Sequence, residues 1–167
     1  MIPATVPQVM DDLRILSLEI QRMPKSIEET FAHPANYPYL SVCTTSTHDM
    51  NPIRAWWEED REVTNDFWHM ILGNQGEAPY FCEPWICRQI LDQHVWSPAM
   101  LTILPLQDWL SMDEQLRRED PNTERINVPA NSRHYWRYRM HLTLEQLAAA
   151  DEFNQALTDM IAASGRC

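Results

Sequence analysis

A run of hydrogen-bonding side chains around a histidine and an aspartate is the part of the sequence best suited to chemistry. Residues 44–49 read Thr-Thr-Ser-Thr-His-Asp and directly follow a short apolar run at 39–44. At the end of a buried strand, His48 and Asp49 could point into a cleft and grip the hydroxyl groups of a ligand. The same residues could instead form a turn, with Asp49 or Asn51 capping the next helix. The residues alone leave both interpretations open.

Three short apolar segments predict the strands that would position these side chains, at 15–21, 39–44 and 100–104. Helical patterns separate them. The first runs over 51–73, with Asn51 as its cap, Pro52 at its first position and Gly73 at its end. The second starts near Pro84 and stops before Pro98. This alternation is typical of an α/β fold with a parallel sheet.

The end of the chain is predicted to be helical after a polar loop at 113–132. Thr143 with Gln146 three residues later forms a capping box, Asp151 can restart a helix, and Gly165 stands where a C-terminal cap would. In parallel sheets the chemistry gathers beyond the carboxyl ends of the strands. The segments to inspect are therefore 19–22, 45–49 and 107–108.

Composition and charge exclude several classes of partner. The 167 residues carry a formal charge of −11, which disfavours nucleic acid and anionic membrane surfaces. The arginine and aromatic cluster at 133–139 is therefore expected to pair with acids. The three glycines cannot form a glycine-rich phosphate-binding loop. No apolar run reaches the 18 residues that a transmembrane helix requires. Because the chain opens without a signal-peptide layout, we expect a cytoplasmic protein.

The cysteines are few and irregularly spaced, which suits reduced thiols better than a disulfide framework. Cys82 and Cys87 could form a zinc site with His69 and His94, but the spacing matches no common zinc signature. Cys87 and His94 also fall on the buried stripe of the predicted helix after Pro84. We therefore expect buried thiols and no metal. The four cysteines are Cys43, Cys82, Cys87 and Cys167.

Five blocks in order resemble the 4-α-glucanotransferases, also called amylomaltases or disproportionating enzymes, of the α-amylase superfamily. The most specific is Ser-Val-Cys-Thr-Thr-Ser-Thr-His-Asp-Met at 41–50, followed by Arg-Ala-Trp-Trp-Glu-Glu-Asp at 54–60. The form of the blocks is most similar to the plant cytosolic-type branch and its bacterial relatives. The other four blocks lie at 13–24, 104–110, 125–129 and 133–140.

The resemblance implies that residues 1–167 are the C-terminal part of a (β/α)8 TIM-barrel catalytic domain. Its three strands would resemble the sixth, seventh and eighth of the barrel. The intact enzyme would transfer α-1,4-glucan segments between malto-oligosaccharides by a retaining double displacement, with no metal or organic cofactor. Most of the tryptophans would pack on the outer helices: Trp56, Trp57, Trp68, Trp85 and Trp96.

The resemblance also implies roles for three residues. Asp49 would stabilise the transition state by holding hydroxyl groups of the sugar at the cleavage site, and His48 would bind the same sugar. Hydrogen bonds to sugar hydroxyls that tighten as charge develops suit such roles. Asn127 would contact the glucan, or it would be a loop amide that satisfies backbone groups. Both interpretations of Asn127 stay open.

The sequence departs from the family in one respect. A retaining mechanism needs a nucleophile and an acid/base, two carboxylates about 5 to 5.5 Å apart. In the family, both blocks that carry them precede the region matched here, so we expect this chain to be inactive alone. Glu19, Asp108 and Asp113 are not matched to those roles. The alternative is a non-catalytic protein that binds glucan or complements the missing N-terminal part of the barrel.

Overall fold

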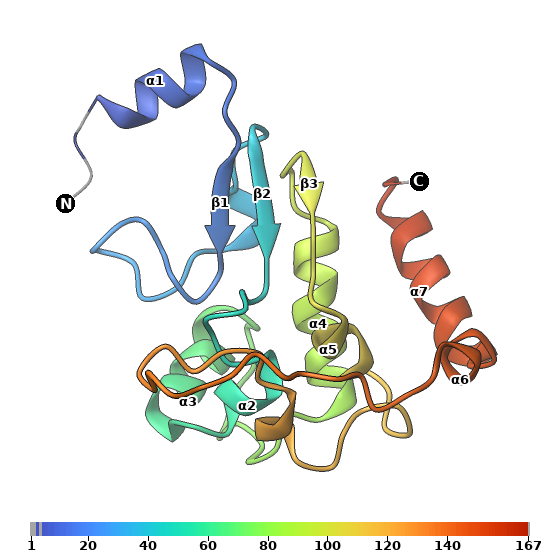
Figure 1. The fold of residues 1–167 in the computed structure, drawn as a ribbon. Coiled ribbons are helices and arrows are strands. Elements are labelled where there is room, and N and C mark those ends of the chain that lie inside the picture. Colours follow the sequence, from blue (N-terminus) through green and yellow to red (C-terminus); the bar gives the residue numbers. More distant parts are fainter. Residues whose placement is uncertain (1–2, 4, 167) are drawn as a thin grey trace.

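The centre of the molecule is a three-stranded parallel sheet (Figure 1). It appears in a computed structural model that describes residue 3 and residues 5–166. The strands are β1 (Ser17–Ile20), β2 (Ser41–Thr44) and β3 (Leu101–Thr102), in that order across the sheet. Each lies inside its predicted segment, so the prediction of a parallel α/β fold is confirmed. Met1, Ile2, Ala4 and Cys167 lie outside the described residues.

Helices occupy most of the positions that the sequence predicts. The chain enters α4 at Pro84, and the capping box of Thr143 and Gln146 forms with both hydrogen bonds. Gly165 has a φ of 72°, as expected for a C-terminal cap. The helices are α1 (Val6–Asp12), α2 (Ile53–Trp57), α3 (Arg61–Met70), α4 (Pro84–Val95), α5 (Leu106–Leu110), α6 (Leu144–Ala148) and α7 (Asp151–Ala163), with short 3-10 turns at η1 (Pro34–Asn36) and η2 (Pro121–Glu124).

The prediction of one continuous helix over 51–73 is wrong. The chain forms α2 and then α3, because Asp60 adopts an extended backbone and its side chain accepts hydrogen bonds from the Glu62 and Val63 N–H groups. Such a cap starts a new helix. Asn51 does not cap α2 either, since its side chain donates to Glu59. In the sequence pattern Asp60 is indistinguishable from a polar surface residue of the helix that it interrupts.

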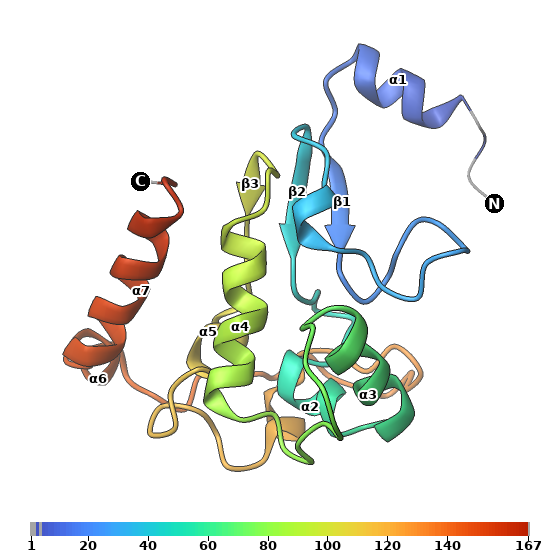
Figure 2. The same ribbon diagram turned by 180° about the vertical axis from the view of Figure 1, so that it is seen from behind.

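The helices cover only one face of the sheet. Cys43 of β2 points toward α4, where its sulfur lies 3.7 Å from the His94 carbonyl oxygen. Figures 1 and 2 show α4 behind the sheet in one view and in front of it in the other. The main core lies between α2, α3 and α4, around fully buried side chains such as Trp57, Phe67, Ile86 and Leu91.

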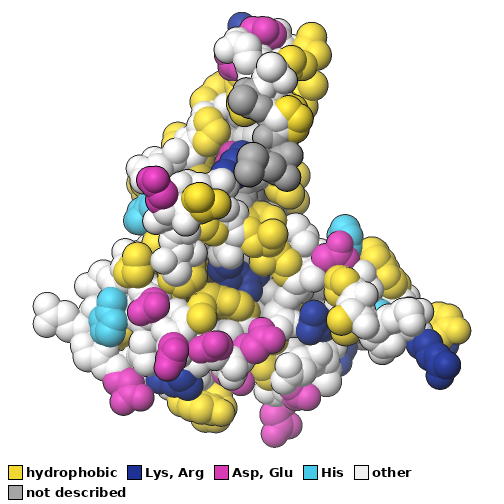
Figure 3. All heavy atoms as spheres, turned by 90° about the vertical axis from the view of Figure 1, so that its left-hand side faces the viewer, with side chains coloured by type: hydrophobic (Ala, Val, Ile, Leu, Met, Phe, Trp, Pro, Cys, Tyr) yellow, Lys and Arg dark blue, Asp and Glu magenta, His cyan; other side chains and the backbone are white. Residues whose placement is uncertain are grey.

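The opposite face of the sheet carries an exposed apolar row. The parallel register places Leu18 beside Val42, and Val42 beside Leu101. Because successive side chains alternate between faces, Ile103 lies on the same side as Leu101. Leu18 is 51% exposed and Ile103 61% exposed. β1 also forms an edge of the sheet. Figure 3 views the molecule from the β1 side. It shows hydrophobic side chains at the surface of the upper part and a group of Asp and Glu side chains on the lower part.

The tryptophans divide into two groups. Trp57 and Trp68 are buried, and Trp56 packs against the same core, which confirms the prediction of helix packing for these three. Trp85 is half exposed, with its ring centroid 5.7 Å from that of Trp68. Trp96 is exposed at the end of α4, so the packing prediction is wrong there.

No helix in the described part of the chain has the length and apolar character that crossing a membrane requires.

We expect the isolated chain to be poorly soluble or loosely folded, because no helix among the described residues covers the exposed apolar row on the sheet. Replacing Leu18→Thr and Ile103→Thr together should reduce light scattering at a fixed protein concentration. The control is Val9→Thr, an equally exposed position on α1 that is away from the sheet. A sharp and reversible melting transition of a soluble, unmodified chain would contradict this expectation.

Candidate functional site

The three strand exits meet at one edge of the molecule. Parallel strands share the edge at which their carboxyl ends lie, and the segment that follows β2 crosses it. The orange segment near residues 120–140 passes below the strand tips in Figure 1. Side chains that are far apart in the sequence therefore meet here.

His48, Asp49 and Asn127 come together at this edge. The Asn127 side-chain amide donates to Asp49 Oδ1 over 2.7 Å, and the Asn127 backbone N–H donates to the His48 carbonyl over 3.1 Å. His48 Nε2 lies 3.4 Å from Asp49 Oδ2. The side chains of His48 and Asp49 are about half exposed, 53% and 52%. The arrangement is a carboxylate and an imidazole held side by side and open to a ligand.

Of the two interpretations of Asn127, the loop amide that satisfies backbone groups is the one that the structure shows. Its Oδ1 accepts a hydrogen bond from the Val128 backbone N–H over 2.9 Å, which fixes the orientation of the amide. The amide nitrogen is then turned toward Asp49. The side chain of Arg125 donates to the Asn127 carbonyl and stiffens the same segment. Asn127 is thus a loop amide that accepts a hydrogen bond from the backbone and donates one to the carboxylate of Asp49, which it positions.

The turn interpretation of residues 44–49 is half correct. The hydroxyl of Thr44 donates to the Ser46 carbonyl, and the hydroxyl of Thr47 accepts from the Asp49 N–H, so the hydroxyls do tie down the turn. Asp49 does not cap the next helix, because α2 begins after Pro52 without a local side-chain cap. Its carboxylate instead faces outward beside His48 and accepts the hydrogen bond from Asn127.

Trp136 is the site residue that the sequence reasoning missed. Its ring centroid lies 4.9 Å from that of His48, at an interplanar angle of 44°, and the side chain is 60% exposed. His134 holds this segment through a 2.9 Å contact between Nε2 and the Ile126 carbonyl. No local pattern indicates this approach. Membership of Trp136 in the fifth resembling block was the one available signal.

The ion pairs expected for the arginines at 133–139 do not form among the described residues. Arg137 instead lies over the Tyr135 ring, 4.8 Å from its centroid. The segment therefore presents aromatic faces next to His48.

A buried carboxyl lies beneath the site. Glu124 is almost completely buried, and neither of its oxygens has a hydrogen-bond partner among the described residues. It lines a cavity of about 60 Å³ together with Ser46, His48 and Gln107. Burial raises the pKa of Glu124 to about 7, although the charge of Arg54 opposes that shift. The acid therefore titrates near neutral pH at this edge.

The residues considered for zinc do not converge. Cys82 and Cys87 are buried with their sulfurs 3.3 Å apart, and burial raises the pKa of Cys82 well above its usual value. His94 is buried, contacts the Ile90 carbonyl, and has a pKa lowered by burial to about 4. His69 is exposed and contacts the Gly76 carbonyl. In the described ranges, no three His, Cys, Asp or Glu side chains are grouped to hold a metal.

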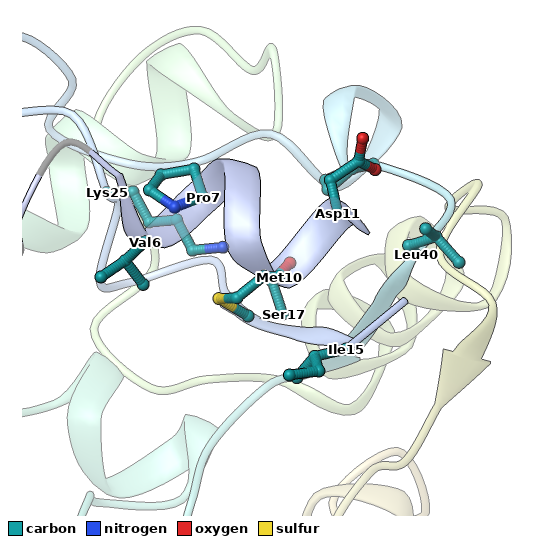
Figure 4. A pocket seen from close by; sticks show the side chains of 9 residues that line it. Val6, Pro7, Met10, Asp11, Ile15, Ser17, Lys25 and Leu40 are labelled. Atoms are coloured by element: carbon teal, nitrogen blue, oxygen red, sulfur yellow. The ribbon is translucent and has the colours of Figure 1, made fainter. Parts of the chain in front are cut away.

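A larger apolar pocket, of about 340 Å³, lies at the opposite end of the strands (Figure 4). Val6, Pro7 and Met10 of α1 line it, together with Ile15 and Leu40 where β1 and β2 begin. Few polar groups face it, and it is remote from His48 and Asp49. This pocket does not belong to the polar site.

The fold and this edge define a parallel α/β protein that offers a carboxylate, an imidazole, an amide and an indole to a ligand. A sequence model of the 4-alpha-glucanotransferase family matches residues 1–144. Because the match covers most of the chain, the chain belongs to that family.

Two relatives of the chain are also 4-alpha-glucanotransferases. The 4-alpha-glucanotransferase DPE2 of Oryza sativa subsp. japonica is 38% identical over 166 residues, covering 99% of this chain and 18% of the rice protein. The 4-alpha-glucanotransferase of Chlamydia muridarum is 30% identical over 166 residues, 95% of this chain and 30% of its own length. The chain thus spans less than a third of either relative.

A solved structure is similar in fold. The amylomaltase from Streptococcus agalactiae in complex with acarbose superposes with a TM-score of 0.71 at 18% identity. The match covers 99% of this chain and 30% of the amylomaltase. The chain therefore has the fold of part of an amylomaltase.

We expect Glu124 to make stability depend on pH. Its pKa is about 7 when folded and 4.5 when exposed. Between pH 4.5 and 7 the folded chain keeps a proton on Glu124 that the unfolded chain releases, so Glu124 contributes a fall in the free energy of unfolding as pH rises, by up to roughly 3 kcal/mol. Buried His94, with its pKa lowered to about 4, contributes an opposite rise, so the comparison of the parent chain with Glu124→Gln isolates the fall due to Glu124. Glu124→Gln should remove this fall. Urea unfolding from pH 4.5 to 8, in the Leu18→Thr/Ile103→Thr background, measures it.

The exposed neighbour Glu119 provides the control. Glu119→Gln should leave the pH dependence unchanged. An identical slope in the parent chain and in Glu124→Gln would show that Glu124 does not carry the effect.

Proposed function

We propose that this chain is the C-terminal part of the barrel of a 4-α-glucanotransferase, and that Asp49, His48 and Asn127 bind the sugar at its cleavage site. The observation that carries the proposal is the hydrogen bond between Asn127 and Asp49, beside His48, in a member of this family. The substrates are malto-oligosaccharides or related α-glucans. The three strands then correspond to the sixth, seventh and eighth of the barrel.

Asp49 acts as the transition-state stabiliser in this proposal. Asn127 holds Oδ1, and Oδ2 faces His48, so the carboxylate is already oriented before a sugar arrives. Glycosyl transfer passes through an oxocarbenium-like state, in which hydrogen bonds to ring hydroxyls strengthen as charge develops. A preoriented carboxylate needs no reorganisation at that moment. The glycosyl group is held covalently by the enzyme and then passed to a hydroxyl of the acceptor.

The nucleophile and the acid/base come from polypeptide outside this sequence. The chain spans 18% of the rice relative and 30% of the amylomaltase, which leaves most of a barrel elsewhere. On this proposal, the chain alone does not turn over substrate. Its three described cysteines are free thiols, in keeping with a reducing compartment such as the cytoplasm.

A second candidate function is complementation of a separate N-terminal piece. The exposed row of Leu18, Leu101 and Ile103 favours it, because these residues need a partner that covers them. The inner layers of a barrel are built from such branched side chains. A chain that only holds glucan would need no such partner.

The test is a chimera in which this chain replaces the matched 166 residues of the rice 4-alpha-glucanotransferase. The chimera should release glucose from maltotriose by disproportionation. Mixing this chain with the remaining N-terminal piece of the rice protein tests complementation in the same assay. A folded chimera without transfer activity would contradict the proposal, and glucan binding without transfer would favour a binding protein.

In the chimera, Asp49→Asn should lower kcat by roughly 100-fold or more, because removing one preorganised group costs about that much. KM should change little, since the substitution keeps the shape of the side chain. Steady-state kinetics on maltotriose measure both. Asp66→Asn, an exposed aspartate on α3, is the matched control. Near-normal turnover of Asp49→Asn would remove the role assigned to Asp49.

Trp136→Ala should raise KM by roughly 2- to 10-fold, because a sugar that stacks on the indole loses about 0.5–1.5 kcal/mol of binding. Trp136→Phe should recover part of the loss. Trp96→Ala serves as control, since Trp96 is also 60% exposed but lies at the end of α4. Equal effects of the two alanine variants would mean that Trp136 has no specific contact with sugar.

A further inference from the structure

Asp108 is a buried carboxylate with an unusual set of partners. It lies in the first turn of α5, just beyond β3, and is completely buried. Its Oδ2 accepts hydrogen bonds from the Thr45 hydroxyl over 2.5 Å and from the Ser46 hydroxyl over 2.8 Å. Its Oδ1 accepts from the Ile53 backbone N–H over 2.8 Å. All three donors belong to the segment that follows β2.

These three bonds hold both ends of the loop that carries His48 and Asp49. Thr45 and Ser46 precede the pair, and Ile53 follows it as the first residue of α2. α2 has no side-chain cap of its own, because Pro52 stands at the capping position. Asp108 therefore caps α2 from a different strand exit, 55 residues away.

Arg22 holds the same loop from the exit of β1. Its guanidinium donates to the Thr45 carbonyl over 2.9 Å and to the Asn51 carbonyl over 2.8 Å. Burial raises the pKa of Asp108, while the three hydrogen bonds and the charge of Arg22 oppose that shift. The loop is thus fixed between a buried acid on one side and a guanidinium on the other.

We propose that Asp108 is a positioning residue, which fixes the 45–53 loop so that Asp49 and His48 are held in the orientation that glucan transfer requires. This rests on the proposed function. Asp108 has no exposed surface and does not touch sugar, so it acts through Asp49. Without it, the hydroxyls of Thr45 and Ser46 and the Ile53 N–H lose their shared acceptor, and the loop gains alternative arrangements. A displacement of about 1 Å can reduce a rate 100-fold.

The first experiment measures kinetics in the chimera with the rice protein. Asp108→Ala should lower kcat by roughly 10- to 100-fold while KM changes less than about 3-fold. Asp108→Asn should recover most of this loss, because the amide oxygen still accepts from Ile53 and the amide nitrogen can donate to the hydroxyl oxygens of Thr45 and Ser46. Thr64→Val, a buried and remote position in α3, controls for loss of stability alone.

A double-mutant cycle with Asp49→Asn separates positioning from general destabilisation. If Asp108 acts through Asp49 and His48, then Asp108→Ala should lower kcat much less in the Asp49→Asn background than in the parent. Additive losses, or an asparagine variant as poor as alanine, would overturn the proposal. If Asp108→Ala does not fold, the same cycle is made with Ser46→Ala, for which a loss of about 3-fold or more in kcat is expected.

A second readout does not depend on activity. The Asn127 backbone N–H donates to the His48 carbonyl, so its hydrogen exchange reports the position of the loop. In Asp108→Ala its exchange should speed up by about 10-fold or more, while the Thr64 N–H, bonded to the Asp60 carbonyl at the start of α3, should not change. Unchanged exchange at Asn127 would overturn the positioning role even if the enzyme is active. Faster exchange in an inactive chimera would contradict the proposed function alone.

Discussion

The arrangement of the site depends on three hydrogen bonds that the carboxylate of Asp108 accepts. A parallel sheet places the exits of its strands at one edge, but it does not by itself fix the loops beyond them. Asp108, after β3, ties down the loop after β2, and Arg22, after β1, holds that loop from the other side. A buried carboxyl group is tolerated only when its hydrogen bonds are satisfied, so the loop has few other arrangements available to it.

The outward-facing part of the site is assembled on that loop from three parts of the chain. Asn127 comes 78 residues after Asp49 and fixes one oxygen of its carboxylate. Trp136 comes later still and lies beside the His48 ring. The result places an aromatic face beside hydrogen-bonding groups, which on the proposed function receive a sugar ring. The apolar face of the sheet is exposed, and the chain spans 18% of the rice relative and 30% of the amylomaltase; on the proposed function, other parts of the barrel would cover that face.

Local patterns were sufficient for the three strands and for α4, α6 and α7. Apolar runs located the three strands, Pro84 marked the start of α4, and the capping box marked α6. Asp60 broke the predicted first helix, because a single aspartate can serve either as a polar surface residue or as a cap and its neighbours do not distinguish the two. Family blocks, rather than residue spacing, brought His48, Asp49 and Asn127 into one hypothesis.

What could not be predicted were contacts across long separations. In the sequence, Asp108 is an acid after the third strand with no assigned role, because the residues that donate hydrogen bonds to it lie 55 to 63 residues earlier. Trp136 looked like part of a basic and aromatic cluster, and only the folded chain places it against His48. Glu124 gave no sign of burial, since η2 has the polar sequence of a surface turn.

The central claim is that the edge formed by Asp49, His48 and Asn127 receives the sugar ring at the cleavage site. The most direct measurement is a crystal structure of the chimera with the rice protein bound to acarbose, the ligand in the amylomaltase complex of similar fold. We expect ring hydroxyls within hydrogen-bond distance of Asp49 and His48, and a sugar face against Trp136. Acarbose bound elsewhere, with Asp49 facing only solvent, would contradict it.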